Sequence, residues 1–149
     1  GAEDKTGRTP LHVAACSEEP GLCGLLVGRQ PKLINRMDVH SRTPLFYAVL
    51  NVHPRAQADA TALLLEQLGD VNARDSYGMV PLHYAAEEGR KIAVSLLLRH
   101  KADANIEDAV DGRTPLQLAK SEHVRQMLRL AMGTKAEVSA ADRREAEAE

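Results

Sequence analysis

Histidine and cysteine are the residue types in this 149-residue chain that could bind a metal ion or act as nucleophiles. A zinc site needs ligands at short, regular spacings, such as two histidines four residues apart with a second pair nearby. The six histidines do not have that arrangement, so we expect no metal site. Cys16 and Cys23 are too few for a disulfide framework, and we expect both to be free thiols. The histidines are His12, His40, His53, His83, His100 and His123.

The other common arrangements of catalytic residues are also missing from the sequence. Nucleophilic catalysis needs a serine or cysteine on a sharp turn with a base held beside it, and no segment has that form. The ten glycines are scattered along the chain and do not form a phosphate-binding loop. We therefore expect no enzymatic activity and no cofactor.

Composition and charge narrow the classes of partner. The net charge of −2 and the 3% aromatic content offer neither a basic footprint nor a base-stacking surface, so we expect no nucleic-acid binding. The chain is 44% hydrophobic, as globular proteins are, but has no apolar run long enough to span a membrane and no signal peptide at its start. We expect a cytoplasmic or nuclear protein without membrane insertion.

A seven-residue motif that begins Thr-Pro-Leu or Val-Pro-Leu occurs four times, and its prolines are separated by 34, 37 and 34 residues. A leucine-rich run and an asparagine follow each of the first three copies at a nearly constant distance. A fixed period of this length is typical of a solenoid built from stacked repeats. The motifs start at Thr9, Thr43, Val80 and Thr114, the leucine-rich runs at Leu25, Leu63 and Leu96, and the asparagines are Asn35, Asn72 and Asn105.

These motifs in this register resemble the ankyrin repeat family. The resemblance implies an all-α ankyrin-repeat solenoid of stacked helix-turn-helix units with hairpin-like turns, over residues 4–132. The four repeats are expected at about 4–37, 38–74, 75–107 and 108–132. Residues 1–3 are interpreted as a linker or cloning remnant, and 133–149 as a charged, Ala/Glu-rich tail that is a frayed helix or disordered. The first unit has no polar outer helix, and we expect further repeats ahead of it.

Departures from the repeat pattern predict local differences between the units. The motif prolines suit the first turn of a helix, and a preceding threonine can cap it, but Val80 cannot. Ser41 stands where other turns have glycine, which predicts a strained or differently shaped turn. The resemblance implies that the imidazoles of His12 and His83 bond to the turn threonine and to neighbouring backbone. Four extra residues around 51–56 are either part of a binding loop or a tolerated surface insertion.

The resemblance implies that the chain binds a partner protein or peptide on the concave face made by the turns and first helices, as part of a larger scaffold or regulatory protein. Arginines along this face favour an acidic partner, although a row of surface arginines is also common as a solvated face. We expect the fragment to be monomeric. The expected contact residues are Lys5, Thr6, Arg8, Met37, Val39, His40, Arg42, Leu50, Asn51, Arg74, Ser76, Tyr77, Met79, Glu87, Glu88 and Arg113, with Cys16 and Ser17 at the floor of the face.

Two further hypotheses remain open from the sequence. The chain could instead be an intramolecular regulatory or spacer domain of a multidomain enzyme. Asn72 and Asn105 each follow a leucine by eight residues and an aspartate by two, which resembles ankyrin asparagines modified by an asparaginyl hydroxylase. The other interpretation is that these asparagines close the turns through side-chain hydrogen bonds.

Overall fold

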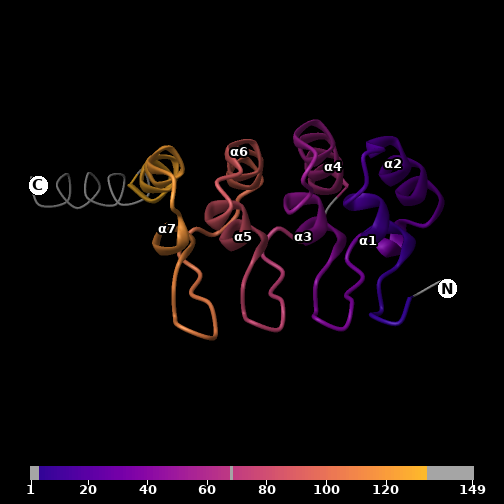
Figure 1. Cartoon of the computed structure of the whole chain (residues 1–149), viewed down its shortest axis with the longest axis horizontal. Coiled ribbons are helices and arrows are strands. Elements are labelled where there is room, and N and C mark those ends of the chain that lie inside the picture. The colour runs from indigo at the N-terminus through magenta and orange to yellow at the C-terminus, as the bar shows by residue number, and fades with distance from the viewer. Residues whose placement is uncertain (1–3, 68, 134–149) are drawn as a thin grey trace, which may run out of the picture.

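The computed structural model describes residues 4–67 and 69–133, and these form a row of four helical units (Figure 1). The predicted all-α solenoid is confirmed. Its helices are α1 (Pro10–Ala15), α2 (Pro20–Arg29), α3 (Pro44–Val49), α4 (Pro54–Glu66), α5 (Pro81–Glu87), α6 (Lys91–Arg99) and α7 (Pro115–Leu118), with a short 3-10 helix η1 (Pro31–Leu33) and a final helix over 122–133. The predicted remnant at 1–3, and all of the predicted tail except residue 133, lie outside the described residues.

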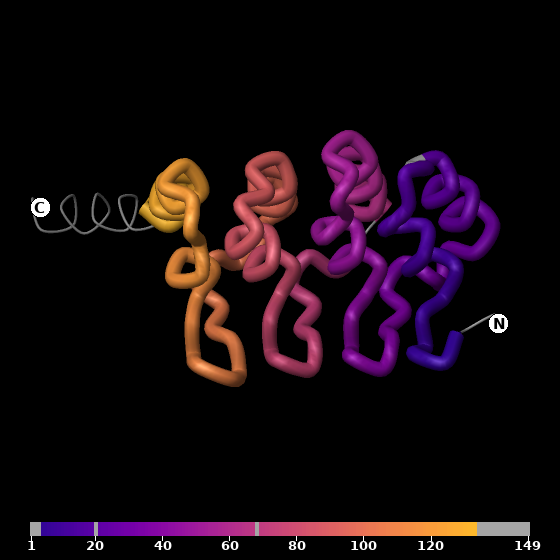
Figure 2. The backbone as a smooth tube through the Cα atoms, in the orientation of Figure 1, coloured from indigo at the N-terminus to yellow at the C-terminus, as the bar shows by residue number. Residues whose placement is uncertain are grey.

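Each unit has the same three layers. The second helices α2, α4 and α6 lie side by side in one row, the first helices form the row beside them, and the hairpin-like turns project together on the opposite side (Figure 2). A motif proline begins each first helix. Proline has no N–H, but a residue at the first helical position makes no N–H bond within the helix, so no hydrogen bond is lost.

The core consists of leucines and alanines shared between neighbouring units. The motif leucines Leu11, Leu45 and Leu82 are at most 1% exposed, and Leu64 and Leu97 on the second helices are fully buried. The motif alanines are also buried, as expected where two helices pack closely. Burial is therefore spread along the row instead of being concentrated in one centre, as in other repeat proteins.

The turn of the second unit has the same shape as its neighbours but requires an unfavourable backbone conformation. Ser41 has a φ of +60°, close to the +73° of Gly7 and the +72° of Gly78. A residue with a Cβ atom is strained at such values. The strain predicted from the missing glycine is thus confirmed, while the overall turn geometry is kept.

The insertion at 51–56 is not simply a loop. Its last residues belong to α4, which has 13 residues where α2 has 10 and α6 has 9. Asn51, at the start of the insertion, is 1% exposed, and its side-chain Nδ2 donates to the carbonyl oxygens of Ala15 and Ser17 at 3.0 and 2.9 Å. The insertion therefore lengthens a helix and ties the second unit to the first.

Candidate functional site

Aspartate side chains build the hairpin-like turns on which most of the expected contact residues lie. In the second unit, Asp38 Oδ1 accepts hydrogen bonds from the backbone N–H groups of His40 and Arg42, at 2.8 and 3.0 Å. Asp75 makes the same pair of bonds to Tyr77 and Met79, at 2.9 and 3.0 Å. Because each carboxylate holds two backbone donors of its own turn, the turns present their remaining side chains at fixed positions.

Backbone hydrogen bonds also join each turn to the next. The N–H of Val39 donates to the carbonyl oxygen of Thr6, that of Ser76 to His40, and that of Ala109 to Tyr77, each at 2.9 Å. The four turns therefore form one continuous ledge along the array instead of four independent loops.

The ledge carries a row of exposed apolar side chains, which we call the apolar row: Val39, Tyr77 and Val110, which are 61%, 50% and 66% exposed. Met37, which directly precedes the turn residue Asp38, is also exposed, to 60%. The sequence analysis named three of these four residues and missed Val110. Its position, two residues after Asp108, repeats that of Tyr77 after Asp75, and this spacing was the available signal.

The other expected contact residues differ in exposure. One group is exposed, one is half-buried, and one member is buried. The exposed ones besides the apolar row and Met37 are Lys5, Thr6, His40, Arg74, Ser76, Glu88 and Arg113, the half-buried ones are Arg8, Arg42, Leu50, Met79 and Glu87, and the buried one is Asn51. The expectation that Asn51 contacts a partner is wrong, because its side chain is enclosed by the first two units.

Three of the arginines expected to form a basic edge are paired with carboxylates of the chain itself. Arg8 Nε lies 2.9 Å from Asp4 Oδ2, and Arg113 Nη2 lies 2.9 Å from Asp111 Oδ2. Arg42 Nε lies 3.3 Å from the buried carboxylate of Asp75. These pairs reduce the positive charge that the turns can offer to a partner.

Arg42 also belongs to a network between units that the sequence analysis did not identify. Its Nη2 donates to Tyr84 Oη at 3.1 Å, its guanidinium lies over the Tyr84 ring, and the Tyr84 hydroxyl donates to Asp75 Oδ2. Tyr47 donates to Asp38 in the same way. Burial, followed by the bond to the aspartate, raises the pKa of both Tyr47 and Tyr84 to about 12, so both stay protonated donors. The aspartate and tyrosine are nine residues apart in both units, and this spacing was the sequence signal.

The motif histidines bond to neighbouring backbone as the resemblance implied, and these bonds also bridge neighbouring units. The expected bond to a turn threonine is present for His12, but His83 bonds to Val80 instead. His12 Nδ1 accepts from the Thr9 backbone N–H at 3.0 Å, and Nε2 lies 2.8 Å from the carbonyl oxygen of Arg42 in the next unit. His83 repeats this arrangement with the Val80 N–H at 3.0 Å and the Arg113 carbonyl at 2.9 Å. In the third unit, where Val80 replaces the threonine, the His83 imidazole therefore still accepts a hydrogen bond from the Val80 N–H.

The second and fourth units lack this bridge. Phe46 replaces the histidine in the second, and the buried hydroxyl of Thr43 has no hydrogen-bond partner in the described part of the chain. In the fourth, Gln117 Oε1 accepts from the Thr114 N–H at 2.9 Å and so reproduces half of the bridge.

We expect His83 to make the array less stable in mild acid. Burial lowers the pKa of His83 below its ordinary value of 6.5. Below about pH 6.5 the unfolded chain then binds a proton that the folded chain does not, so the free energy of unfolding falls as pH falls. His83→Gln should keep the bond to Val80, as Gln117 does for Thr114, but should lose the bond to the next unit, at a cost of about 1 kcal/mol near pH 7.5.

Urea denaturation of both proteins between about pH 7.5 and pH 5 tests this expectation. The gap between wild type and His83→Gln should narrow toward acid, because only the wild type has this titrating group. A gap that stays constant over the range would show that His83 is not held neutral by folding.

Asn72 takes part in a second kind of contact between units. Its Oδ1 accepts from the Asp103 N–H at 3.0 Å, and Asn35 makes the same bond to Asp70 at 2.7 Å. Asn72 is half-buried and Asn105 is exposed. The side chain of Asn72 thus joins two units, and within its own turn it is the Asp70 carboxylate that accepts from the Asn72 N–H. Hydroxylation of Asn72 and Asn105 stays a prediction.

The described residues do not bring the histidines, cysteines and acidic residues together as a metal site would. Over 4–67 and 69–133, no group of three such side chains could hold a metal ion. Cys23 is buried, and its burial, with a smaller effect of Cys16, raises the pKa of its thiol to about 11; Cys16 is exposed. In the same ranges no helix is long and apolar enough to cross a membrane.

Comparison with known proteins agrees with the repeat pattern of the sequence and with the helical units of the structure. A family model described as ankyrin repeats in three copies matches residues 1–75 and 55–142. The chain is 30% identical over 135 residues to the B-cell lymphoma 3 protein homolog of Mus musculus, which covers 89% of the chain and 30% of that protein. It is 35% identical over 108 residues to the neurogenic locus notch homolog protein 2 of Homo sapiens, covering 72% of the chain and 4% of that protein.

A third relative is the ankyrin repeat protein nuc-2 of Neurospora crassa, which is 31% identical over 99 residues, covering 66% of the chain and 9% of that protein. The chain therefore spans less than a third of the length of each of these relatives.

Proposed function

Because the chain belongs to the ankyrin repeat family, whose members are in general protein-interaction modules, we propose that it binds a partner protein or peptide along its turn ledge. The observation that supports this best is the apolar row of Val39, Tyr77 and Val110 on turns joined by backbone hydrogen bonds. Exposed aromatic and aliphatic side chains on a rigid support are typical of the centre of protein interfaces.

The partner's chemistry follows from the side chains on and beside the ledge. Its own apolar side chains would cover the row, and acidic residues would lie opposite the exposed Lys5 and Arg74. Arg8, Arg42 and Arg113 contribute less to this preference, because each already has a carboxylate partner in the chain. A cytoplasmic or nuclear location, within a larger scaffold or regulatory protein, belongs to the same proposal.

A second candidate is docking against another domain of a larger protein through the outer helices. Ile92 on α6 and Leu130 on the final helix are 56% and 66% exposed, so this side also offers apolar contacts. Such docking would make the array an internal regulatory or spacer domain.

Affinity capture with matched variants separates the two candidates. Tyr77→Ala with Val110→Ser should reduce recovery of a turn-bound partner about tenfold or more, because central aromatic residues dominate interface energies. Ile92→Ser with Leu130→Ser should leave that recovery unchanged. The reverse pattern would favour the outer helices, and equal recovery by all three proteins would contradict the turn ledge as the binding site.

A variant of Arg42 is unsuitable for this experiment. Its guanidinium contacts Asp75 and Tyr84 in the neighbouring unit, so a charge reversal there would disturb the array as well as any binding.

A further inference from the structure

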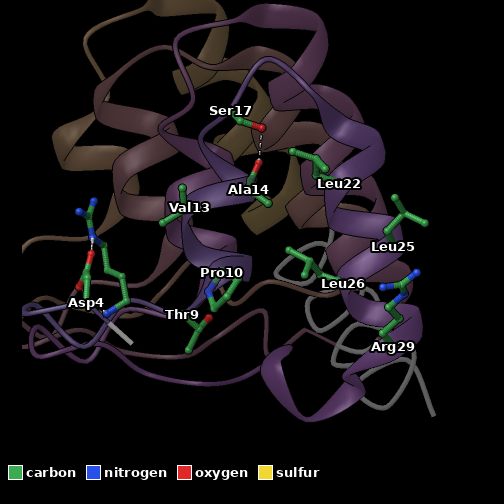
Figure 3. Close-up of a pocket in the computed structure, with 11 residues that line it drawn as sticks. Asp4, Thr9, Pro10, Val13, Ala14, Ser17, Leu22, Leu25, Leu26 and Arg29 are labelled. Atoms are coloured by element: carbon green, nitrogen blue, oxygen red, sulfur yellow. Dashed lines mark hydrogen bonds and ion pairs between the residues drawn. The ribbon is translucent and has the colours of Figure 1, made fainter. Parts of the chain in front are cut away.

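A hollow of about 570 Å³ lies between α1 and α2 on the outer face of the first unit, where Leu22, Leu25 and Leu26 line it (Figure 3). Leu22 stands three residues before the leucine run of its unit, as Ala60 and Ala93 do in the next two units. Ala60 and Ala93 are at most 1% exposed, because α4 packs against α2 and α6 against α4. This hollow therefore belongs to the face on which units stack, and stacking explains its apolar lining.

A second hollow lies on the side of the row away from the first helices, between α6 and the final helix. It has a volume of about 390 Å³, and we call it the outer groove. It lies between two units that are already stacked, so a further unit at either end of the row would not fill it. The residues that line it are Lys91, Ile92, Ser95, Leu96 and Arg99 on α6, and His123 and Met127 on the final helix.

The repeat does not require the apolar side chains at the outer groove. Ile92 stands four residues before the leucine run of its unit, where the second unit has Asp59 and the first has Gly21. Ile92 is 56% exposed, and Asp59 is also exposed, so this position faces solvent in both units. Leu130 follows Met127 by three residues on the same side of the final helix and is 66% exposed. Exposed aliphatic side chains beside a hollow indicate contact with an apolar partner.

The charged side chains of the outer groove are basic. Lys91 and Arg99 are exposed, and over 4–67 and 69–133 neither forms an ion pair. Glu122, beside His123 in the sequence, is held by Arg129, whose Nη1 lies 3.0 Å from its Oε1. Unlike the paired arginines of the turns, Lys91 and Arg99 therefore keep their charges available for a partner.

The neighbouring helix α4 has acidic residues on the same side of the row. Asp59 and Glu66 are exposed and stand at the positions that Ile92 and Arg99 occupy in the third unit, while Arg55 lies in the extra first turn of α4. Because like charges repel, an acidic partner would lie along the outer groove instead of across the row. The nine residues of α6 make the groove about 13 Å long, so two to three turns of a partner helix would fill it.

We propose that the outer groove binds an acidic amphipathic helix of a partner protein. An apolar stripe on that helix would cover Ile92, Met127 and Leu130, and acidic residues beside the stripe would pair with Lys91 and Arg99. A helix fits better than an extended strand, because the helices that form the groove have no free backbone N–H or C=O groups for a strand to pair with. This site is separate from the turn ledge and does not depend on it, and it gives docking through the outer helices a defined partner chemistry.

Other occupants complement the outer groove less well. In a two-fold dimer through this groove, Lys91 and Arg99 would face the same basic residues of the second copy. Residues 134–149 have Val138 as their one large aliphatic side chain, so they cannot supply an apolar stripe. Since the groove is small, the expected dissociation constant for an acidic helix is of the order of 100 µM.

A methyl NMR titration tests the proposal on the 149-residue chain. Of the four methionines, Met127 lines the outer groove, Met37 and Met79 belong to the turns, and Met132 lies at the end of the final helix. The probe is a synthetic amphipathic helical peptide with leucines three and four residues apart and glutamates on both flanks. It should shift the Met127 methyl signal and leave that of Met37 in place, and a peptide with lysines instead of glutamates should bind at least about tenfold more weakly.

Two double variants with the same change in net charge locate the binding site. Lys91→Glu with Arg99→Glu should weaken binding of the acidic peptide about tenfold or more, because both changes place like charges together. Lys5→Glu with Arg74→Glu alters exposed residues of the turns and should leave the affinity within about twofold. Far-ultraviolet circular dichroism would establish that both variants are folded.

Three results would each overturn the outer groove as the binding site. They are a shift of Met37 without one of Met127, an equal loss of affinity in both double variants, and no shift with up to about 1 mM of the acidic peptide. The first of these would still support binding at the turn ledge, so the two sites can fail independently.

Discussion

Leu97→Ala is expected to lower the free energy of unfolding by about 2 to 5 kcal/mol, the range for truncating a buried leucine. Leu97 lies on α6 and is fully buried in the core shared with the neighbouring units. Removing it would leave a cavity that the short helices around it cannot close without losing other contacts. Urea denaturation followed by circular dichroism measures the difference.

A matched control for this measurement lies on the same helix. Ile92 is 56% exposed, so Ile92→Ala should change the free energy of unfolding by no more than about 0.5 kcal/mol. A cost below about 1 kcal/mol for Leu97→Ala would contradict its position at the centre of the shared core.

Gly78→Ala should destabilise the array by about 2 to 4 kcal/mol, through backbone strain and overpacking together. The backbone of Gly78 has a φ of +72°, and an added Cβ would lie 2.6 Å from the Ala109 Cβ and 2.7 Å from the Ala109 nitrogen. The Ala109 N–H also donates to the carbonyl oxygen of Tyr77, so relief of the clash would break a bond between turns.

Gly112 separates these two effects. It has a similar φ of +67°, but an added Cβ there would meet no atom within 4 Å. Gly112→Ala should therefore show the backbone strain alone, about 1 to 2 kcal/mol. Equal costs for the two substitutions in parallel urea denaturation would mean that the third and fourth turns are not in close contact.

The repeat period and the motif types were sufficient to predict the fold. Pro10, Pro44, Pro81 and Pro115 mark where the first helices begin, because proline is favoured in the first helical turn and disfavoured deeper in a helix. The spacing of the leucine runs likewise predicted the second helices. These features are local, so one sequence is enough to read them.

Contacts between units were harder to predict, because they depend on how far one unit is shifted along the next. Asn51 was expected at the surface, but its amide reaches carbonyl groups of the first unit. Arg42 was expected to face a partner, yet it is held by Asp75 and Tyr84. Both contacts depend on the position of the neighbouring unit, which the residue type alone does not give. Contact of Arg42 with a partner stays a prediction.

The replacement of a motif histidine by Phe46 has a consequence for how the array unfolds. In a linear array, each unit is coupled only to its neighbours, and the weakest junction limits cooperativity. The junction between the second and third units has no imidazole bridge and relies partly on the ionic contact of Arg42 with Asp75. Added salt screens ion pairs, whereas the bonds made by His12 and His83 join an imidazole to a neutral carbonyl. If the array comes apart in stages, it should therefore do so first at this junction, into two pairs of units, and the burial of Asp75 limits how much added salt can weaken it.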